Sequence, residues 1–373
     1  MSSAIGVGVM SGTSLDGVDL VAAEFSWTEK EIYQYSILSS RSIPYSDQWV
    51  SRLANLIDQS GEIFAKTHVY YGHFLGATIR NFIKEENISP DFVGSHGHTI
   101  FHQPEKNFTA QIGDGETVVS YLTCPYVTNF RNKDVALGGQ GAPLVPLGEK
   151  YLFPGRHLFL NLGGFCNLAV EGLAYDVSSC NGVLNYLVQQ IYPELPFDDK
   201  GNLAASGNFS EALFTELEAL PFYQAAAPKS LGWEWVIEEV LPIVNRSELP
   251  IQDKLHTFCH HVANQIFQSL RALNRQNESI LISGGGTHNE FLISLIAERL
   301  STLDIHIEKP VDDSFIDFKE ALIFSFLALR TLTGKPTILP SATGASEAGI
   351  TGSIHLPQER QFNWFDFNKP VAK

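Results

Sequence analysis

One stretch near the N-terminus constrains the fold more than any other, because two apolar strands flank a turn of small and hydroxylated residues. It runs from Ile5 to Ala22 and reads IGVGVMSGTSLDGVDLVA. Glycines and hydroxyls at a strand end can place N–H groups around a phosphate without a helix N-terminus. Asp16 and Asp19 could face that phosphate only with a cation such as Mg²⁺ between them, directly or through water. An ordinary hairpin turn favours the same residues and stays open as the alternative.

The rest of the first half predicts a strand meander followed by helices. Short strands are expected over 4–11, 18–26 and 33–43. Apolar residues then recur every three or four positions, which predicts helices, including a long one from about Gly61. A buried strand from Asp91 is expected next, and it runs into a polar loop that carries His96 and His98.

The second half of the chain repeats the order of strands, glycine turn, strands, helix, strand and helix. One strand, His157–Asn161, leads into Gly163–Gly164, and another, Ser279–Ser283, leads into Gly284–Gly286. The repeat indicates two α/β units of the same topology, and 373 residues exceed one ordinary core. Ligands are then expected in a cleft between strand-end loops. Two unrelated α/β domains are the alternative.

Composition and charge argue against several classes of function. The net charge is −16 and the pI about 5.1, whereas nucleic acids and anionic membranes attract basic surfaces, so neither partner is expected. No uncharged apolar window approaches about 18 residues, and no basic region opens the chain, so neither a membrane span nor a signal peptide is expected. The four cysteines are scattered without CxxC spacing, which favours free thiols and a cytoplasmic location.

Several polar residues are candidates for chemistry. Asp176 lies at a strand end and could act as a general base on a water or hydroxyl. Capping of the next helix by Asp176, Ser178 or Ser179 is the alternative. Arg131 precedes the glycine-rich loop 138–141 and suits a carboxylate or phosphate, with a surface salt bridge as the alternative.

The histidines and one late carboxylate are more ambiguous. His96, His98 and His102 have a spacing that zinc could use, but no acidic or cysteine ligand accompanies them, so we expect hydrogen bonding to a substrate instead. His260-His261 falls inside a predicted helix and is interpreted as structural. Glu320 lies near the start of the last long helix, where an acid also favours the helix dipole. The glycine turns match neither the P-loop nor the dinucleotide-binding pattern.

Taken together, these motifs resemble the anhydro-N-acetylmuramic acid kinase family of the actin/hexokinase/Hsp70-like superfamily. The resemblance covers nearly the whole chain and rests on MSGTSLDGVD (10–19), GSHGHT (94–99), QIGD (111–114), NFR (129–131) with Asp134, GGQGAPLVP (138–146), NLGG (161–164) and SGGG (283–286). It implies an α/β, two-domain actin-like ATPase fold of duplicated ribonuclease-H-like domains with an interdomain cleft. The first domain would span 1–130 with about 335–373, and the second, carrying the catalytic acid, 131–334.

The resemblance also implies an activity. The protein would be an ATP-dependent kinase that opens 1,6-anhydro-N-acetylmuramic acid with water and forms N-acetylmuramic acid 6-phosphate in cell-wall recycling. ATP and Mg²⁺ would be its cofactors, and it would form a homodimer. Asp176 would be the catalytic base, and Ser95, His96, Arg131 and Glu320 would bind the sugar. The residues expected to bind ATP are Gly12, Thr13, Ser14, Leu15, Asp16, Gly17, Val18, Asp19, Gly163, Gly164, Gly284, Gly285 and Gly286. No residue is expected to coordinate the metal ion directly. Asp16 and Asp19 could contact it through bridging water molecules.

The chain departs from the family pattern after Asp176. The family's Asp-x-Gly-Pro-Gly-Asn is here Asp176-Val-Ser-Ser-Cys-Asn181, so backbone contacts to phosphate could be lost or replaced by the two serine hydroxyls. His98 stands where Gln is usual, and Asn185 where a second Asp is common. Two alternatives follow. One is a kinase for another sugar or acid, and the other is a non-catalytic nucleotide- or sugar-binding relative.

Overall fold

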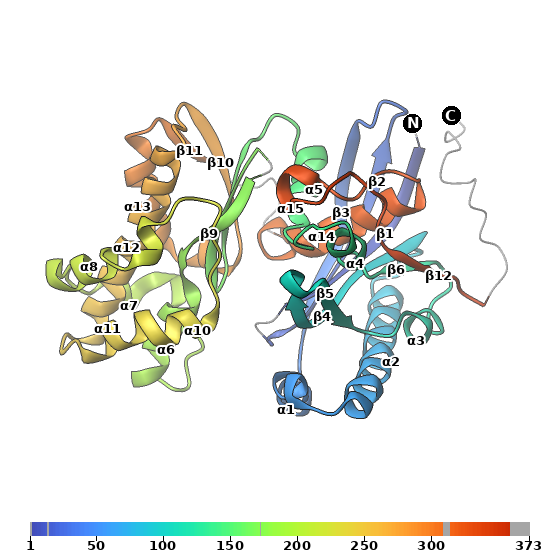
Figure 1. The fold of residues 1–373 in the computed structure, drawn as a ribbon, viewed down its shortest axis with the longest axis horizontal. Coiled ribbons are helices and arrows are strands. Elements are labelled where there is room, and N and C mark those ends of the chain that lie inside the picture. Colours follow the sequence, from blue (N-terminus) through green and yellow to red (C-terminus); the bar gives the residue numbers. More distant parts are fainter. Residues whose placement is uncertain (1, 13–14, 172, 309–313, 359–373) are drawn as a thin grey trace. The chain divides into compact units, whose positions relative to one another are not determined.

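The computed structural model describes residues 2–12, 15–171, 173–308 and 314–358. The chain forms two compact units, Met1–Pro154 with Phe318–Lys373 and Gly155–Asp317 (Figure 1). Residues 131–154 and 318–334, which the sequence-based boundaries gave to the second domain, therefore belong to the first unit. The physical reason is helix packing, because a Cβ at Gly148 would lie 2.6 Å from Ile323. The predicted interdomain cleft stays a prediction.

The first unit is built on a seven-stranded sheet. Its antiparallel meander consists of β1 (Ser2–Ser11), β2 (Gly17–Trp27) and β3 (Tyr33–Pro44). Parallel to β1 lies β4 (Phe92–Gln103), and parallel to β4 lies β6 (Tyr126–Thr128). The order β3-β2-β1-β4-β6 is extended beyond β6 by β12 (Ser353–His355), and β5 (Phe108–Ile112) pairs with β4. All three strands of the predicted meander are confirmed.

The alternation Gly6-Val7-Gly8-Val9 explains how helices cover both faces of this sheet. Val7 and Val9 point into a core shared with α2 (Gly61–Glu85). The glycines point the other way, where a Cβ on Gly8 would lie 1.8 Å from the carbonyl oxygen of Ala321 in α14 (Ser314–Leu332). The absent side chains let α14 approach the strand closely.

Shorter helices complete the first unit. They are α1 (Asp47–Ala54), η1 (Leu56–Asp58), η2 (Pro104–Lys106), α3 (Gly115–Val119), α4 (Asn132–Ala136), α5 (Val145–Leu152) and α15 (Pro340–Thr343).

The second unit repeats the strand order of the first. Its sheet runs β9-β8-β7-β10-β11, in which β7 (Leu158–Leu162), β8 (Phe165–Val170) and β9 (Leu173–Ser179) are an antiparallel meander. Parallel to β7 lies β10 (Glu278–Ser283), followed by β11 (Ile305–Glu308). The same order in both sheets confirms the predicted duplication and the ribonuclease-H-like, actin-type fold class.

Helices pack on this second sheet around one large apolar core. The longer ones are α6 (Asn181–Ile191), α12 (Ile251–Ala272) and α13 (Glu290–Ser301). The shorter ones are η3 (Asp199–Gly201), α7 (Asn202–Ala205), α8 (Glu211–Glu218), α9 (Pro221–Gln224), α10 (Trp233–Trp235), η4 (Val236–Val240), α11 (Leu241–Arg246) and η5 (Gly285–His288).

An ion pair joins the start of the second unit to the end of its last strand. Arg156, just before β7, donates two hydrogen bonds to the carboxylate of Glu308 at the end of β11, at 2.7 and 2.6 Å. The paired geometry is the strong, planar form of an arginine–carboxylate contact. Across the part of the chain that the structure describes, no helix is both long and apolar enough to cross a membrane.

Candidate active site

The segment after β1 contains most of the residues expected to bind ATP. Gly12 is half-buried and Asp16 is exposed, while Thr13 and Ser14 lie outside the described residues. Leu15 has a φ of 60°, and a Cβ on Gly17 would lie 2.3 Å from the carbonyl oxygen of Ile43. Gly17 is therefore required by the close approach of β3.

The last two residues of that segment lie within β2. The Val18 side chain is fully buried in the core, so only its backbone is available to a ligand. The Asp19 carboxylate accepts a hydrogen bond from the Ser42 hydroxyl at 2.5 Å. Asp16 and Asp19 are the carboxylates of this segment that could hold a cation through water.

Arg131 and His96 form the polar centre of the first unit's candidate sugar site. The Arg131 Nε–H donates to His96 Nε2 at 2.8 Å, and its Nη1–H donates to the Gly141 carbonyl at 2.7 Å. Burial, together with the Arg131 charge, holds the pKa of His96 well below its usual value, so the ring is neutral and accepts this bond. Burial lowers the pKa of Arg131 to about 10. The alternative prediction, that Arg131 forms a surface salt bridge, is wrong, because its guanidinium is buried and contacts His96 and Gly141.

The glycine-rich loop that supplies the Gly141 carbonyl is held by Asp134. This fully buried carboxylate accepts hydrogen bonds from the Gly141 N–H and the Thr343 hydroxyl, both at 2.6 Å. A Cβ on Gly139 would lie 2.3 Å from the same carboxylate. Loop 138–141 therefore acts as a support for Arg131.

Glu320 lies close enough to Arg131 to interact electrostatically. Burial raises the pKa of Glu320, opposed by the charges of Lys319 and Arg131. The neighbouring Lys319 makes a buried ion pair with Glu149 at 2.9 Å. Sequence reasoning missed this pair, because its members are far apart along the chain and neither lies in a recognisable motif.

The prediction that His96 and His98 lie in a polar loop is wrong. Both residues lie inside β4, because β5 pairs with its C-terminal half and extends it. A bulge at Gly97, with a φ of 75°, turns the two rings to different sides. His96 packs against Phe324 of α14, and His98 packs against Tyr71 of α2. Two rings so placed cannot share one metal ion. Ser95, also buried, accepts a hydrogen bond from the Gly97 N–H at 3.2 Å.

In the second unit, Asp176 is held by hydrogen bonds to both carboxylate oxygens. Asn167 Nδ2 of β8 donates to Oδ1 at 3.0 Å, and the Leu231 N–H donates to Oδ2 at 2.8 Å. The Asp176 N–H donates to the Lys229 carbonyl at 2.9 Å. The segment Lys229–Leu231 thus runs beside β9 and fixes the direction in which this carboxylate points.

Asp176 does not cap the following helix. The N-cap of α6 is Cys180, and no side chain makes a capping bond there. Ser178 and Ser179 are fully buried, and the Ser178 hydroxyl donates to the Ser179 carbonyl at 2.8 Å. Neither hydroxyl is placed to replace the missing glycine contacts to a phosphate.

The predicted glycine turns of the second unit meet at one end of its sheet. The N–H groups of Cys180 and Asn181 donate to the carbonyls of Gly164 and Gly163, at 2.9 and 3.1 Å. The Asn181 amide lies beside Gly286, where an added Cβ would be 3.0 Å from its Oδ1. Asn161 and Asn181, which sequence reasoning did not single out, link these turns.

Gly284 and Gly285 complete that junction. Gly284 has a φ of 87°, and a Cβ there would lie 2.5 Å from Asn161 Oδ1. A Cβ added at Gly285 would have only the Asn181 amide nitrogen within 4 Å, at 3.9 Å. A Cβ added at Gly164 would meet nothing within 4 Å. The open space at these positions suits a ligand that approaches the backbone.

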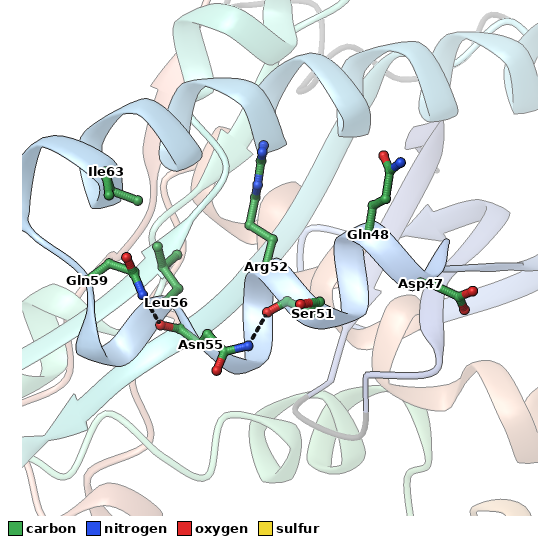
Figure 2. A pocket seen from close by; sticks show the side chains of 8 residues that line it. All are labelled: Asp47, Gln48, Ser51, Arg52, Asn55, Leu56, Gln59 and Ile63. Carbon is green, nitrogen blue, oxygen red and sulfur yellow. Dashed lines mark hydrogen bonds between the residues drawn. The ribbon is translucent and has the colours of Figure 1, made fainter.

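A concave surface elsewhere contains none of the predicted site residues. It has a volume of about 590 Å³ and lies between α1 and the start of α2 (Figure 2). Its lining residues are Asp47, Gln48, Ser51, Arg52, Asn55, Leu56, Gln59 and Ile63. All except Leu56 are exposed. The amides of Asn55 and Gln59 already bind main-chain carbonyls of this helical turn, so we do not assign the surface a ligand.

The duplicated sheets, with polar groups at their strand ends, define the class of the fold as two ribonuclease-H-like α/β units of the actin type. A family model described as anhydro-N-acetylmuramic acid kinase matches residues 4–357. An enzyme of that name from Shewanella baltica (strain OS185) is 33% identical over 381 residues, covering 94% of this chain and 98% of its own length. Another, from Shewanella sp. (strain MR-4), is 31% identical over 386 residues, with the same coverage of both chains. The chain belongs to the anhydro-N-acetylmuramic acid kinase family.

Solved structures show more distant likenesses. The (R)-2-hydroxyglutaryl-CoA dehydratase component A of Acidaminococcus fermentans is 11% identical, with a TM-score of 0.45, covering 86% of this chain and 96% of its own. The ROK hexokinase of Thermus thermophilus is 11% identical, with a TM-score of 0.37, covering 87% and 99%. We base no conclusion on likenesses this weak, and the fold class rests on the strand order.

Proposed function

We propose that this protein hydrolyses the internal ether bridge of 1,6-anhydro-N-acetylmuramic acid and phosphorylates the released O6 with ATP. Asp176 is the general base. Its carboxylate takes a proton from water, the water oxygen bonds to C1, and the C1–O6 bond breaks. O6 then attacks the γ-phosphorus, the bond to the β-phosphate bridging oxygen breaks, and ADP leaves. The products are N-acetylmuramic acid 6-phosphate and ADP.

One observation carries this proposal most directly, namely the Asp176 carboxylate held from both sides. Hydrogen bonds from Asn167 and Leu231 to separate oxygens fix the orientation of the carboxylate. Each oxygen keeps a second lone pair with which to accept a proton from water. A fixed base of this kind reduces the entropic cost of reaching the transition state.

The first unit supplies the groups that suit the sugar, and both units contribute residues proposed to bind ATP. The Arg131 guanidinium has five N–H groups, of which two contact His96 and Gly141. Others are left for the carboxylate of the sugar's lactyl group, while Glu320 and Ser95 suit its polar atoms. Gly12–Asp19 of the first unit, with Gly163–Gly164 and Gly284–Gly286 of the second, bind ATP. The exposed Asp16 and the neighbouring Asp19 fit a water-mediated magnesium ion, which supplies charge neutralisation when bound with ATP.

The decisive experiment is turnover in water enriched in ¹⁸O. Purified full-length protein with Mg-ATP and the anhydro sugar should release ADP and give a sugar phosphate that carries one ¹⁸O at C1. The Asp176→Asn variant should bind ATP but lose at least about a thousandfold in rate, because the base is removed. A phosphorylated product without ¹⁸O, or equal rates for both proteins, would refute the mechanism.

Two alternatives remain to be separated in the same assay. The loop after Asp176 favours a non-catalytic relative, because its serines are buried and its N–H groups bond to the turn Gly163–Gly164. Nucleotide and sugar binding without turnover would support that reading. Turnover of a different sugar or acid in a substrate panel would support a related kinase. The proposal also includes a cytoplasmic location, a homodimeric state and a role in cell-wall recycling. Light scattering tests the homodimer, and growth on the amino sugar tests the role in recycling.

A further inference from the structure

One residue, Tyr45, contacts both sides of the segment that joins β1 to β2 and that is proposed to bind the ATP phosphates. Tyr45 follows β3, and its N–H donates to the carbonyl of Asp16 at 3.2 Å. Its hydroxyl lies 2.5 Å from the hydroxyl of Ser11, the last residue of β1. The start and the end of the segment between β1 and β2 are therefore linked through a single side chain and its own backbone.

The Ser11 hydroxyl is the centre of a buried cluster. Besides Tyr45, it contacts the hydroxyl of Tyr71 in α2 at 2.8 Å and His98 Nδ1 in β4 at 2.8 Å. The Tyr45 and Tyr71 hydroxyls are themselves 2.5 Å apart. Ser11, Tyr71 and His98 are each at most 3% exposed, and Tyr45 is 9% exposed. Water therefore does not satisfy these groups, and they must satisfy one another.

Counting protons fixes the role of His98. The cluster has four close contacts, three among the hydroxyls and one to His98, but the three hydroxyl groups carry only three protons. If Ser11 donated to His98, two tyrosine protons would remain for three oxygen–oxygen contacts. The arrangement that makes all four contacts hydrogen bonds therefore takes its fourth proton from His98, whose Nδ1–H donates to Ser11. The hydroxyl protons then run in a ring, from Ser11 to Tyr45, from Tyr45 to Tyr71, and from Tyr71 back to Ser11.

We propose that this cluster of Ser11, Tyr45, Tyr71 and His98 positions the ATP-phosphate segment, and that His98 acts in it as an obligatory hydrogen-bond donor. The inference rests on the proposed role of Gly12–Asp19 in binding ATP. None of the four side chains needs to touch the nucleotide, so they are positioning residues. Their effect is to hold Ser11 and Asp16 at the spacing that the segment between them requires.

The chemistry of His98 gives a sharp pair of variants. His98→Gln keeps an N–H donor near the Ser11 hydroxyl, whereas His98→Leu removes the donor and leaves the ring one proton short. We expect His98→Leu to raise the KM for ATP and the dissociation constant of ADP about tenfold, the size of one lost buried hydrogen bond. The KM for the sugar should stay within about twofold, and His98→Gln should restore nucleotide affinity.

Tyr45→Phe and Tyr33→Phe form a matched second pair. Both tyrosines are buried at opposite ends of β3, and the Tyr33 hydroxyl contacts Arg330 rather than the segment. Both variants should lower the melting temperature, but only Tyr45→Phe should weaken ADP binding. Tyr45→Phe also serves if His98→Leu fails to fold.

The outcomes separate this inference from the proposed function. Two results would overturn the positioning role. One is a parallel loss of affinity for ADP and for the sugar in His98→Leu, and the other is equal nucleotide affinity in Tyr45→Phe and Tyr33→Phe. ADP binding is measured without sugar or turnover. A wild-type protein that binds ADP but phosphorylates no sugar would contradict the proposed function, while the four variants still decide on the cluster. A wild-type protein that does not bind ADP would overturn both.

Discussion

At the scale of single residues, the most informative contact is the one between Asn167 and Asp176. The amide donates to one carboxylate oxygen of a half-buried acid, and a backbone N–H holds the other. Hydrogen bonds to a charged group contribute about 1.5–3 kcal/mol each. In this site, the two hydrogen bonds stabilise one orientation of the Asp176 carboxylate relative to the others.

Removing the amide should therefore affect the chemical step. We expect Asn167→Ala to lower kcat about tenfold to a hundredfold with little change in the KM for ATP, measured by steady-state ADP release. The matched control is Asn264→Ala, since Asn264 also donates to a carboxylate in the same unit, that of Glu218, at 2.8 Å. The control should lower the melting temperature and leave kcat nearly unchanged. Equal losses of kcat in both variants would mean that Asn167 is only structural.

His98 should also leave a signature in the pH dependence of stability. Burial lowers its pKa from 6.5 to about 4 in the folded protein. The unfolded chain therefore binds the extra proton first as pH falls, and stability is lost between about pH 6.5 and pH 4. The loss should reach about 3 kcal/mol relative to His98→Gln. Urea unfolding of both proteins across this pH range measures it, and parallel curves would contradict the assignment.

The sequence predicted single site residues only where a short motif of neighbouring residues marked them. Asp176 stands at a predicted strand end and Arg131 just before a glycine-rich loop, and the structure places each in a polar cluster. The partners that hold them, such as Leu231 for Asp176 and Thr343 for Asp134, are 55 and 209 residues away. Contacts of that separation depend on the packed fold, and no periodicity in one sequence encodes them.

At the scale of elements, strand β1 shows what alternation can and cannot predict. The pattern of valines and glycines indicated a strand, and its expected bounds of 4–11 agree with Ser2–Ser11. The same pattern did not reveal that the glycines face a helix from the other end of the chain. Strands as short as β6 and β12, with three residues each, carry no measurable period and were not expected.

The close approach of α14 makes Gly8 sensitive to any side chain. A Cβ at Gly8 would overlap the Ala321 carbonyl, which is backbone and cannot rotate away. Gly8→Ala should destabilise the protein by at least about 3 kcal/mol, or prevent folding, as overpacking of a core does. Gly61→Ala, at the start of α2 with nothing within 4 Å, is the control and should be neutral. Chemical denaturation compares them, and equal stability would show that the helix can move away.

At the scale of the whole molecule, the C-terminal segment returns to support the glycine-rich loop 138–141 beside Arg131. Thr343 donates its hydroxyl to Asp134 and its carbonyl accepts the Gln140 N–H at 2.8 Å. Residues near the end of the chain thus fix a loop in its first half, and that loop positions Arg131. These contacts join the loop to the first unit, whereas the sequence-based boundary near residue 130 assigned it to the second.

Thr343→Val should test this long-range support. The buried Asp134 carboxylate would lose one donor, the loop would loosen, and the KM for the sugar should rise about fivefold to tenfold with the KM for ATP unchanged. Thr333→Val is the control, because the Thr333 hydroxyl contacts only the carbonyls of Leu329 and Arg330 in its own helix. Equal KM values for the sugar in the two variants would argue against a role for the C-terminal segment in the site.

The contact between Arg156 and Glu308 has a practical consequence for taking this enzyme apart. It joins the start of a continuous unit, Gly155–Asp317, to the end of the last strand in that unit's sheet. A continuous stretch whose first and last strands are joined near its termini has the anatomy of an insertable module. We therefore expect that it can be exchanged for the matching stretch of a relative. Chimeras with a Shewanella enzyme would then transplant Asp176, the proposed base, and leave Arg131, proposed to bind the sugar, in its original host.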